Sequence, residues 1–207
     1  MEPDKLSKIY DGFADSYDSN RELFNIDGII NGFRDRLKSD SGNLLDLGCG
    51  AGVPLGKSFI DSGWSVTGVD FSPKMLSLAN KHVPEMKTLC ADMRTVEFEE
   101  GEFNAITLIY SLFHIPKSQH SELFAKLFRW LKPNGMALFT YATKEYTGQE
   151  EMDGYKAFMG QQLYYSHKTP SALYKDLETI GFDIEAREYR EIGGEIFLWI
   201  TIAKPTA

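Results

Sequence analysis

The chain has 207 residues, 43% of them hydrophobic and 25% charged, a composition that excludes a disordered or collagen-like chain and predicts about one globular domain. Its 22 Lys and Arg against 30 Asp and Glu give a net charge of -8 with no basic run, which argues against a nucleic-acid partner because phosphate contacts need clustered positive charge. The two cysteines are too few for a disulfide framework, and no apolar stretch is long enough for a signal segment or a membrane span, so we expect a cytoplasmic protein without a membrane partner.

The beginning of the chain predicts two helices before any strand. Apolar side chains recur at helical spacing at Leu6, Tyr10, Phe13, Ala14 and Tyr17. A second helix is expected over Glu22–Lys38. We therefore interpret residues 1–40 as an N-terminal helical cap.

Short β-branched runs then alternate with amphipathic segments, which is typical of strand–helix units around a mostly parallel sheet. The expected strands are Asn43–Leu47, Trp64–Val69, Lys87–Cys90, Phe103–Tyr110 and Met136–Tyr141. Helices are expected from about Pro54, from Ser72-Pro73 to about Lys81, and from about Ser118 to the turn Lys132–Gly135. Together these elements predict a core over residues 41–141.

The last third of the chain is less uniform. Residues 142–168 are aromatic-rich and irregular in pattern, and we interpret them as a substrate-side insertion. Thr169-Pro170 predicts a helix that ends at Gly181, and two antiparallel strands are expected at about Phe182–Tyr189 and Ile196–Ala203. Residues 169–207 thus complete a single domain with a helix and a hairpin.

The strongest chemical signal is a strand that runs into a glycine-rich turn at Leu44–Gly52. Glycines let a ligand approach the backbone, and exposed N–H groups there would favour a negatively charged or polar ligand. The dinucleotide fingerprint Gly-x-Gly-x-x-Gly requires a third glycine where this chain has Val53. A nicotinamide or flavin site is therefore disfavoured.

Two acidic residues follow the next two strands. Asp70 lies about 20 residues beyond the glycine turn, the place where a carboxylate accepts hydrogen bonds from both ribose hydroxyls. Asp92 and Met93 follow the third strand and could meet the exocyclic amine and the face of a purine. The pattern predicts an adenosine-type ligand without a 2′-phosphate.

These residues, together with Leu131–Gly135, resemble the class I S-adenosylmethionine-dependent methyltransferases, and the resemblance runs from Asp46 to the last strand. Tyr10–Asp18 is similar to the Tyr-x-x-x-Ala-x-x-Tyr-Asp helix of small bacterial-type members. The resemblance implies an α/β, Rossmann-like fold with helices on both faces of a seven-stranded, mostly parallel sheet of order 3-2-1-4-5-7-6, the last strand antiparallel. Asn134 departs from the usual Lys-Pro-Gly-Gly turn, but asparagine tolerates left-handed backbone angles.

Carried over residue by residue, the resemblance implies S-adenosylmethionine as the cofactor. The backbone of Gly48–Gly52 would hold its methionine part, Asp70 the ribose, Phe71 the adenine face, and Asp92 with the Met93 backbone the adenine edge. The expected cofactor residues are Tyr17, Asp46, Gly48, Cys49, Gly50, Asp70, Phe71, Asp92, Met93 and Tyr110.

The acceptor side is less defined. His114 follows the buried fourth strand and is a candidate general base, with a structural histidine as the alternative. The aromatic segment offers Tyr164, Tyr165 and Gln161 as substrate contacts, with Tyr10 from the first helix, or its rings pack inward as a cover. The four histidines lack metal-ligand spacing, so no metal is expected.

The predicted reaction is direct displacement, in which an O, N, C or S nucleophile of a small-molecule acceptor takes the methyl group and S-adenosylhomocysteine is released. Because the methyl group is already activated, holding the nucleophile in line with it supplies much of the rate enhancement of such a reaction. The expected assembly is a monomer or homodimer. The alternatives left open are a non-catalytic S-adenosyl-ligand-binding protein, a nicotinamide oxidoreductase, and a methyltransferase acting on a protein or peptide.

Overall fold

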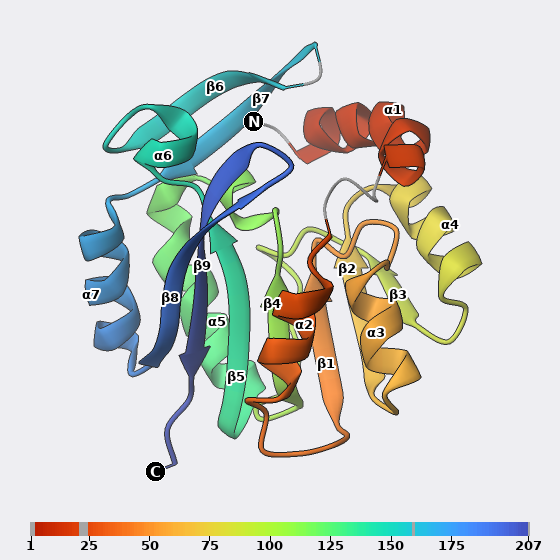
Figure 1. The fold of residues 1–207 in the computed structure, drawn as a ribbon, viewed down its shortest axis with the longest axis vertical. Coiled ribbons are helices and arrows are strands. Elements are labelled where there is room, and N and C mark those ends of the chain that lie inside the picture. Colours follow the sequence, from red (N-terminus) through yellow and green to blue (C-terminus); the bar gives the residue numbers. More distant parts are fainter. Residues whose placement is uncertain (1–2, 21–24, 159, 207) are drawn as a thin grey trace.

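A seven-stranded sheet of order β3-β2-β1-β4-β5-β9-β8 forms the centre of the molecule (Figure 1). It is seen in a computed structural model that describes residues 3–20, 25–158 and 160–206, with side chains described from residue 6 to 14 and from 25 onward. The strands are β1 Asn43–Leu47, β2 Ser65–Asp70, β3 Lys87–Cys90, β4 Phe103–Leu108, β5 Leu131–Tyr141, β8 Asp183–Ile192 and β9 Glu195–Ala203. Neighbouring strands from β3 to β5 are parallel, and β9 is antiparallel to both β5 and β8. Counted within this sheet, the order is the expected 3-2-1-4-5-7-6.

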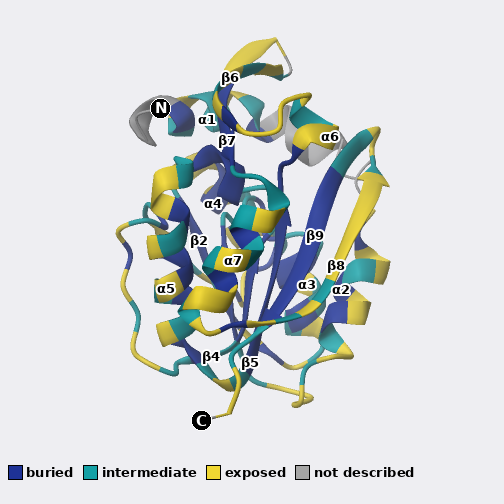
Figure 2. Cartoon of the chain, turned by 90° about the vertical axis from the view of Figure 1, so that its left-hand side faces the viewer, coloured by how far each residue is buried: buried dark blue, intermediate teal, exposed yellow. Residues whose placement is uncertain are grey.

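Helices cover both faces of the sheet (Figures 1 and 2). One face carries α2 (Asp27–Arg34), α3 (Leu55–Asp61) and α4 (Pro73–His82), and the other carries α5 (His120–Trp130) and α7 (Pro170–Ile180). Successive strand residues divide between the two faces, so that Leu44 packs in the cluster with Phe59, whereas Leu45 packs in the cluster with Phe124. The central strands are thus buried on both sides, which explains why β4 is buried at every position except the half-buried Asn104.

Local signals set several of the boundaries. The Ser72 hydroxyl accepts a hydrogen bond from the Met75 amide at 3.1 Å, and the Thr169 hydroxyl accepts one from the Ala172 amide at 3.3 Å. Both predicted N-caps are therefore confirmed. The left-handed backbone expected at Asn134 is also confirmed, with φ of 61°.

The segment expected to be irregular is in fact mostly regular. It contains α6 (Lys144–Thr147) and an antiparallel hairpin of β6 (Met152–Phe158) and β7 (Gln161–His167), which forms a second, two-stranded sheet. Side chains of β6 alternate between more buried and exposed positions, which is the period of a strand. The aromatic content of the segment conceals this alternation in the sequence.

Two further boundaries differ from expectation. The second helix is shorter than predicted within the described residues, because α2 ends at Arg34 and the chain turns before β1. The fifth strand begins earlier, at Leu131 directly after α5, because Leu131 pairs with Phe103 before the ladder shifts register.

The first helix, α1 (Pro3–Asn20), and the β6–β7 hairpin lie over the same end of the sheet, where the parallel strands have their carboxyl ends (Figure 1). The Ser7 hydroxyl donates to the carbonyl of Phe71 at 3.0 Å, and the Ser72 hydroxyl donates to the Asp11 carboxylate at 2.5 Å. On the hairpin side, the rings of Phe13 and Phe158 meet edge to face at 6.1 Å. The cap helix is therefore anchored both to the core and to the hairpin.

Candidate active site beneath the cap helix

The glycine turn after β1 is held by its own backbone amides. The amides of Gly48 and Cys49 both donate to the carbonyl of Val69, at 2.7 and 3.1 Å. The Gly50 amide donates to Oδ2 of Asp70 at 3.0 Å. These N–H groups are therefore committed within the protein, which corrects the expectation that they are exposed to favour an anionic ligand.

The glycines are needed at this turn for two different reasons. At Gly48, with φ of 79°, an added Cβ would lie 2.4 Å from Cβ of Ser111. The Gly48 backbone therefore packs directly against the Ser111 side chain in the loop after β4. At Gly50, with φ of 51°, an added Cβ would meet nothing within 4 Å. The space on the Cβ side of Gly50 is therefore open to a ligand, whereas the corresponding space at Gly48 is filled by Ser111.

Two buried carboxylates lie next to the turn. Asp46 on β1 accepts a hydrogen bond from the Thr107 hydroxyl at 2.7 Å, and burial, together with the charge of Asp70, raises its pKa to about 7. Burial raises the pKa of Asp70 to about 6, against the hydrogen bonds from the Ser72 and Gly50 amides that lower it. Ionising both groups is costly in the protein alone, so this site is suited to a ligand that brings positive charge.

The carboxylate of Asp70 keeps acceptor capacity for a ligand hydroxyl. The Ser72 amide donates to Oδ1 at 2.8 Å and the Gly50 amide to Oδ2 at 3.0 Å. A carboxylate offers about four acceptor positions, so hydrogen bonding to a ribose hydroxyl is compatible with both amides. Asp70 is 8% exposed and reaches the end of β2 beside the glycine turn.

Asp92 and Met93 differ in what they offer. The Asp92 carboxylate is bound by Arg94, whose Nη2 lies 2.6 Å from Oδ2 and whose Nε also contacts both oxygens. The pKa of Asp92 is lowered, because these bonds outweigh its partial burial. Met93 is buried, and its Cε lies 3.5 Å from the place a Gly48 side chain would occupy. Met93 therefore packs under the turn, while an amine that bound Asp92 would share it with Arg94.

His114 lies at the centre of a polar chain that joins three segments of the protein. Its Nδ1 is 2.8 Å from the carbonyl oxygen of Tyr164 on β7, and its Nε2 is 2.7 Å from the hydroxyl of Tyr10 on α1. Because a carbonyl can only accept, Nδ1 carries the proton and the Tyr10 hydroxyl donates to Nε2. Burial lowers the pKa of His114 to about 4, so the imidazole is neutral at physiological pH.

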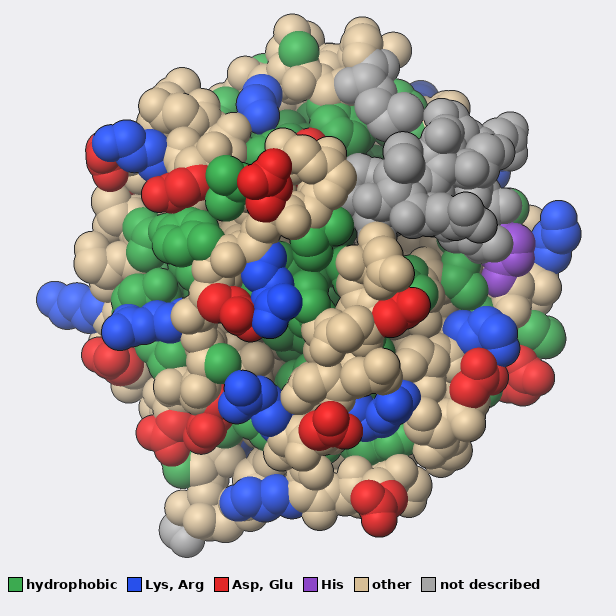
Figure 3. Space-filling model, viewed as in Figure 1, with side chains coloured by type: hydrophobic (Ala, Val, Ile, Leu, Met, Phe, Trp, Pro, Cys, Tyr) green, Lys and Arg blue, Asp and Glu red, His purple; other side chains and the backbone are tan. Residues whose placement is uncertain are grey.

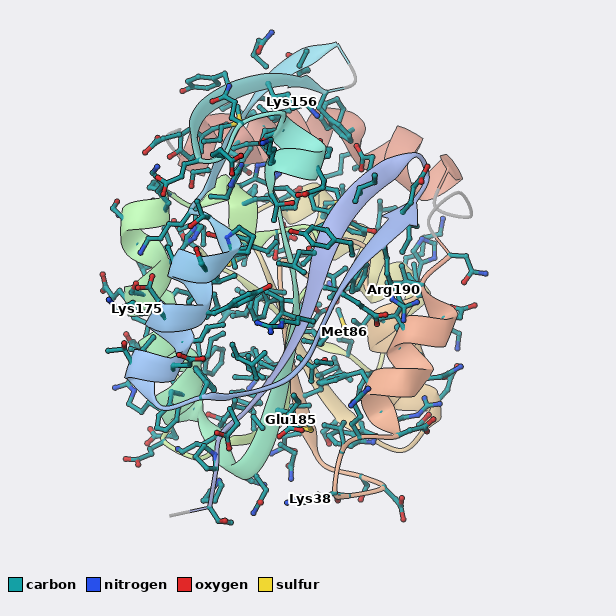
Figure 4. All side chains as sticks on the ribbon, turned by 60° about the vertical axis from the view of Figure 1, so that its left-hand side comes forward. Lys38, Met86, Lys156, Lys175, Glu185 and Arg190 are labelled. Carbon is teal, nitrogen blue, oxygen red and sulfur yellow. The ribbon has the colours of Figure 1, made fainter. Side chains whose placement is uncertain are left out.

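Aromatic rings surround this chain. Phe113 stacks between Tyr165 and Phe197, with ring centroids 5.2 Å away in each case. The hydroxyl of Tyr146 on α6 donates to that of Tyr165 at 3.2 Å. Lys156 reaches from β6 toward α6 and lies over the Tyr146 ring, 3.5 Å from its centroid (Figure 4). The hairpin and α6 thus close one side of the site with packed rings.

The remaining predicted residues fall at different places. Tyr110 lies two residues after β4 with φ of 54°, and its ring centroid is 5.2 Å from that of Phe197. Tyr164 is buried, and its hydroxyl donates to Asp153 at 2.7 Å, so its contact with the site is through its backbone. Gln161 is exposed at the end of the hairpin. The Tyr17 side chain lies outside the described residues.

Cys49 is a structural residue of the turn. It is buried, and burial raises the pKa of its thiol well above the ordinary value, with further contributions from Asp46 and Asp70. A thiol that stays protonated is a poor nucleophile. Its place among the expected cofactor residues therefore concerns its backbone.

Sequence reasoning missed several residues that shape the site: Asp11, Arg94, Thr107 and Phe113. Thr107 could have been found, because it interrupts the apolar run of β4 and pairs in register with Asp46. Arg94, two residues after Asp92, also had a local signal. Asp11 and Phe113 act through contacts between distant segments, for which the sequence carries no local pattern.

Among the side chains that the structure describes, from residue 6 to 14 and from 25 onward apart from residues 159 and 207, no group of three or more His, Cys, Asp or Glu is arranged to hold a metal ion. Within residues 3–20, 25–158 and 160–206, no helix is long and apolar enough to cross a membrane.

Known sequences resemble the part of the chain that contains the glycine turn. Residues 44–135 match the protein family described as "Methyltransferase domain". YqeM of Bacillus subtilis (strain 168) is 32% identical over 136 residues, which cover 63% of this chain and 54% of YqeM. The ubiquinone biosynthesis O-methyltransferase of Dechloromonas aromatica is 30% identical over 146 residues, covering 67% of this chain and 61% of that protein. The match thus spans 54% and 61% of the length of these two curated relatives.

Solved structures share the fold over nearly the whole chain. A DhpI complex with S-adenosylhomocysteine (SAH) superimposes with a TM-score of 0.70, at 18% identity, and covers 99% of this chain and 98% of DhpI. The 1,6-didemethyltoxoflavin-N1-methyltransferase of Burkholderia thailandensis gives a TM-score of 0.68, at 19% identity, and covers 99% of this chain and 91% of that one. At these identities the likeness concerns the fold.

Proposed function

We propose that this chain, which carries a class I methyltransferase domain, binds S-adenosylmethionine and transfers its methyl group to a small organic acceptor. The observation that carries the proposal is the pair of buried carboxylates at the glycine turn. Asp46 and Asp70 lie on β1 and β2 beside this turn and have raised pKa values, and the amides of Gly48, Cys49 and Gly50 already donate within the protein. A ligand with an ammonium and a sulfonium group would place positive charge beside these two carboxylates and favour their ionised forms. The pyrophosphate of a dinucleotide would instead place negative charge beside them.

The residues present fit such a cofactor. Open space over Gly50 accommodates its methionine part, and Asp70 accepts from the ribose hydroxyls. Phe71, at the end of β2, offers a ring for the adenine, with Asp92 and the Met93 backbone toward its edge. Tyr17, Cys49 and Tyr110 complete the assigned cofactor residues. The bound cofactor supplies a methyl group activated by the sulfonium.

On the acceptor side, the protein itself contributes a wall of aromatic rings that fits the acceptor and a group that accepts its proton. We assign residues 142–168, the first helix with Tyr10, and the hairpin residues Tyr164 and Tyr165 to this side, with Gln161 at its outer end. Their packed rings exclude water from the reacting atoms, which favours positioning of a small acceptor. We assign His114 as the general base: it is neutral, its Nδ1–H is fixed by the Tyr164 carbonyl, and its Nε2 accepts the Tyr10 hydroxyl in the protein without an acceptor.

A small acceptor fits the surface better than a nucleic acid does. On the face shown in Figure 3, Lys and Arg side chains lie among Asp and Glu side chains rather than in one patch. The chain carries a net charge of -8, which repels a phosphate backbone.

Calorimetric titration with SAH, with NADH as the parallel control, tests the proposal. Micromolar binding of SAH alone supports the cofactor assignment. Methyl transfer from labelled S-adenosylmethionine into a protein-free small-molecule extract, compared with transfer into an extract of denatured proteins, then tests the acceptor class. Binding of NADH in place of SAH, or binding of SAH with no transfer to either extract, contradicts the proposal.

A further inference from the structure

Lys156 is a charged residue at an inward-facing position of the β6–β7 hairpin. Alternate residues of β6 from Met152 to Phe158 are the more buried ones, and Lys156 is among them. Its cross-strand partner is Leu163, which is fully buried, and opposite residues of an antiparallel pair share one face. Burial at this position lowers the pKa of Lys156, because it disfavours the charged ammonium. The charge therefore depends on partners supplied by other elements.

Three groups receive the Lys156 ammonium. Its Nζ donates to the carbonyl oxygen of Tyr146 at 3.0 Å and lies 3.5 Å from the centroid of the ring of the same residue. The face of an aromatic ring attracts a cation. The charge of Glu195 also favours the charged form of Lys156. The Tyr146 ring, the Tyr146 carbonyl and the Glu195 carboxylate thus form a site for an ammonium group, which the protein's own lysine occupies.

Glu195 reaches this site from the opposite hairpin, β8–β9. It is the first residue of β9, two residues before Phe197, so both side chains lie on the same face of the sheet. The Phe197 ring packs against Tyr146 with ring centroids 4.3 Å apart. Burial raises the pKa of the half-buried Glu195, against the charge of Lys156 and a hydrogen bond with Tyr146, which both lower it. Lys156 therefore compensates the desolvation of this carboxylate only in part, and a better-placed cation would compensate it further.

The ammonium site lies next to the acceptor side assigned above. The ring centroid of Tyr146 is 5.5 Å from that of Tyr165, which is 5.0 Å from the imidazole of His114. Two ring-to-ring steps thus separate the site from His114. At Gly154, the inward-facing position before Lys156 on β6, an added Cβ would meet nothing within 4 Å. The hairpin therefore leaves space into which the lysine side chain can move.

We propose that the Tyr146 ring and the Glu195 carboxylate bind a positively charged amine of the acceptor, and that Lys156 holds this place until the acceptor displaces it. The inference rests on the proposed function and narrows its acceptor to a small cationic amine. The charged nitrogen is remote from the atom that is methylated, because a cationic nitrogen has no lone pair with which to attack. The net charge of -8 attracts such a cation, whereas an anionic acceptor bound by Lys156 would be repelled by Glu195.

Two substitutions separate the roles of the charged groups. Lys156→Met keeps the hydrocarbon chain and removes the competing ammonium. Glu195→Gln keeps a hydrogen-bonding group for Tyr146 and removes the charge. Lys175→Met on α7 and Glu185→Gln on β8, at exposed positions on other elements, are the matched controls (Figure 4).

The first test is an NMR titration of the full-length, tyrosine-labelled protein with tetramethylammonium, in the presence and absence of SAH. Tert-butyl alcohol is the neutral control of similar shape, and acetate is the anionic one. We expect Lys156→Met to bind tetramethylammonium about 10-fold more tightly than wild type and Glu195→Gln to bind it about 10-fold more weakly, with both control variants unchanged. No gain in affinity on Lys156→Met, or equal binding of tert-butyl alcohol, overturns the proposal. Acetate binding that Lys156→Met abolishes also overturns it, because the lysine would then anchor an anion.

The second test measures methyl transfer from labelled S-adenosylmethionine into a protein-free extract that has been divided on a cation exchanger. We expect labelled product from the retained, cationic fraction. Lys156→Met should raise turnover at low concentrations of this fraction and leave it unchanged at saturation. Product from the unretained fraction alone overturns the proposal. A wild-type protein that does not bind SAH overturns the proposed function instead, and the titration without SAH still decides whether the ammonium site exists.

Discussion

Replacing Asp46 by asparagine should stabilise the protein while weakening cofactor binding. The pKa of Asp46 rises from 3.8 to about 7 on folding, and each pKa unit is worth about 1.4 kcal/mol, so ionising this group in the fold costs on the order of 4 kcal/mol. Asparagine keeps an acceptor for the Thr107 hydroxyl and removes the charge. We therefore expect Asp46→Asn to raise the free energy of unfolding by about 1–4 kcal/mol at pH 8.

The pH dependence gives this prediction its sign. The folded-state pKa of Asp46 lies above its unfolded value, so its contribution to stability is fully present below pH 3.8 and is lost as the pH rises through about 7. The gap between the variant and wild type should accordingly be large in urea denaturation at pH 8 and shrink toward pH 4. Asp92→Asn is the matched control with the opposite sign, because the pKa of Asp92 is lowered by Arg94. A gap that is absent, or equal at both pH values, would refute the reasoning.

The remaining predictions concern the turn, the ribose contact and the base. Asp70→Asn should weaken SAH binding by about 1–3 kcal/mol in calorimetry, because a buried hydrogen-bond partner is lost; unchanged affinity would contradict the ribose assignment. His114→Ala should leave SAH affinity intact, and a large loss would move His114 to the cofactor side. Gly48→Ala should cost at least about 2 kcal/mol in urea denaturation, because the new Cβ meets Ser111 at 2.4 Å, whereas Gly50→Ala should cost about 1 kcal/mol from its backbone angle alone. Equal losses would argue against the close contact at Gly48.

The sequence predicted the core elements closely because their signals are local. β1 has the expected bounds, Ser72 and Thr169 cap the helices that follow them, and Asn134 adopts the left-handed backbone. Each of these features depends on a few neighbouring residues. The strand order, by contrast, came from the family resemblance and not from the pattern of the residues.

What the sequence could not supply depends on register and on contacts between distant segments. The glycine-turn amides are engaged because the register of β1 and β2 brings the Val69 carbonyl under Gly48 and Cys49. Neither the composition nor the residue spacing of the sequence indicates this strand register. The β6–β7 hairpin was missed because β7 is buried continuously from Leu163 to His167, so its share of the alternating pattern is lost.

The way the hairpin contributes to the base has a consequence for specificity. Tyr164 fixes the His114 tautomer through its backbone carbonyl, while its side chain is turned to Asp153. Side chains on the hairpin can therefore change the shape of the acceptor side without altering the proton-accepting geometry. The Tyr10 hydroxyl, which donates to Nε2 of His114, comes from a separate segment that is anchored to the loop after β2. The hairpin thus serves acceptor recognition through its side chains and orients His114 through a backbone carbonyl. Substitutions of hairpin side chains can therefore change acceptor recognition while the orientation of His114 is kept.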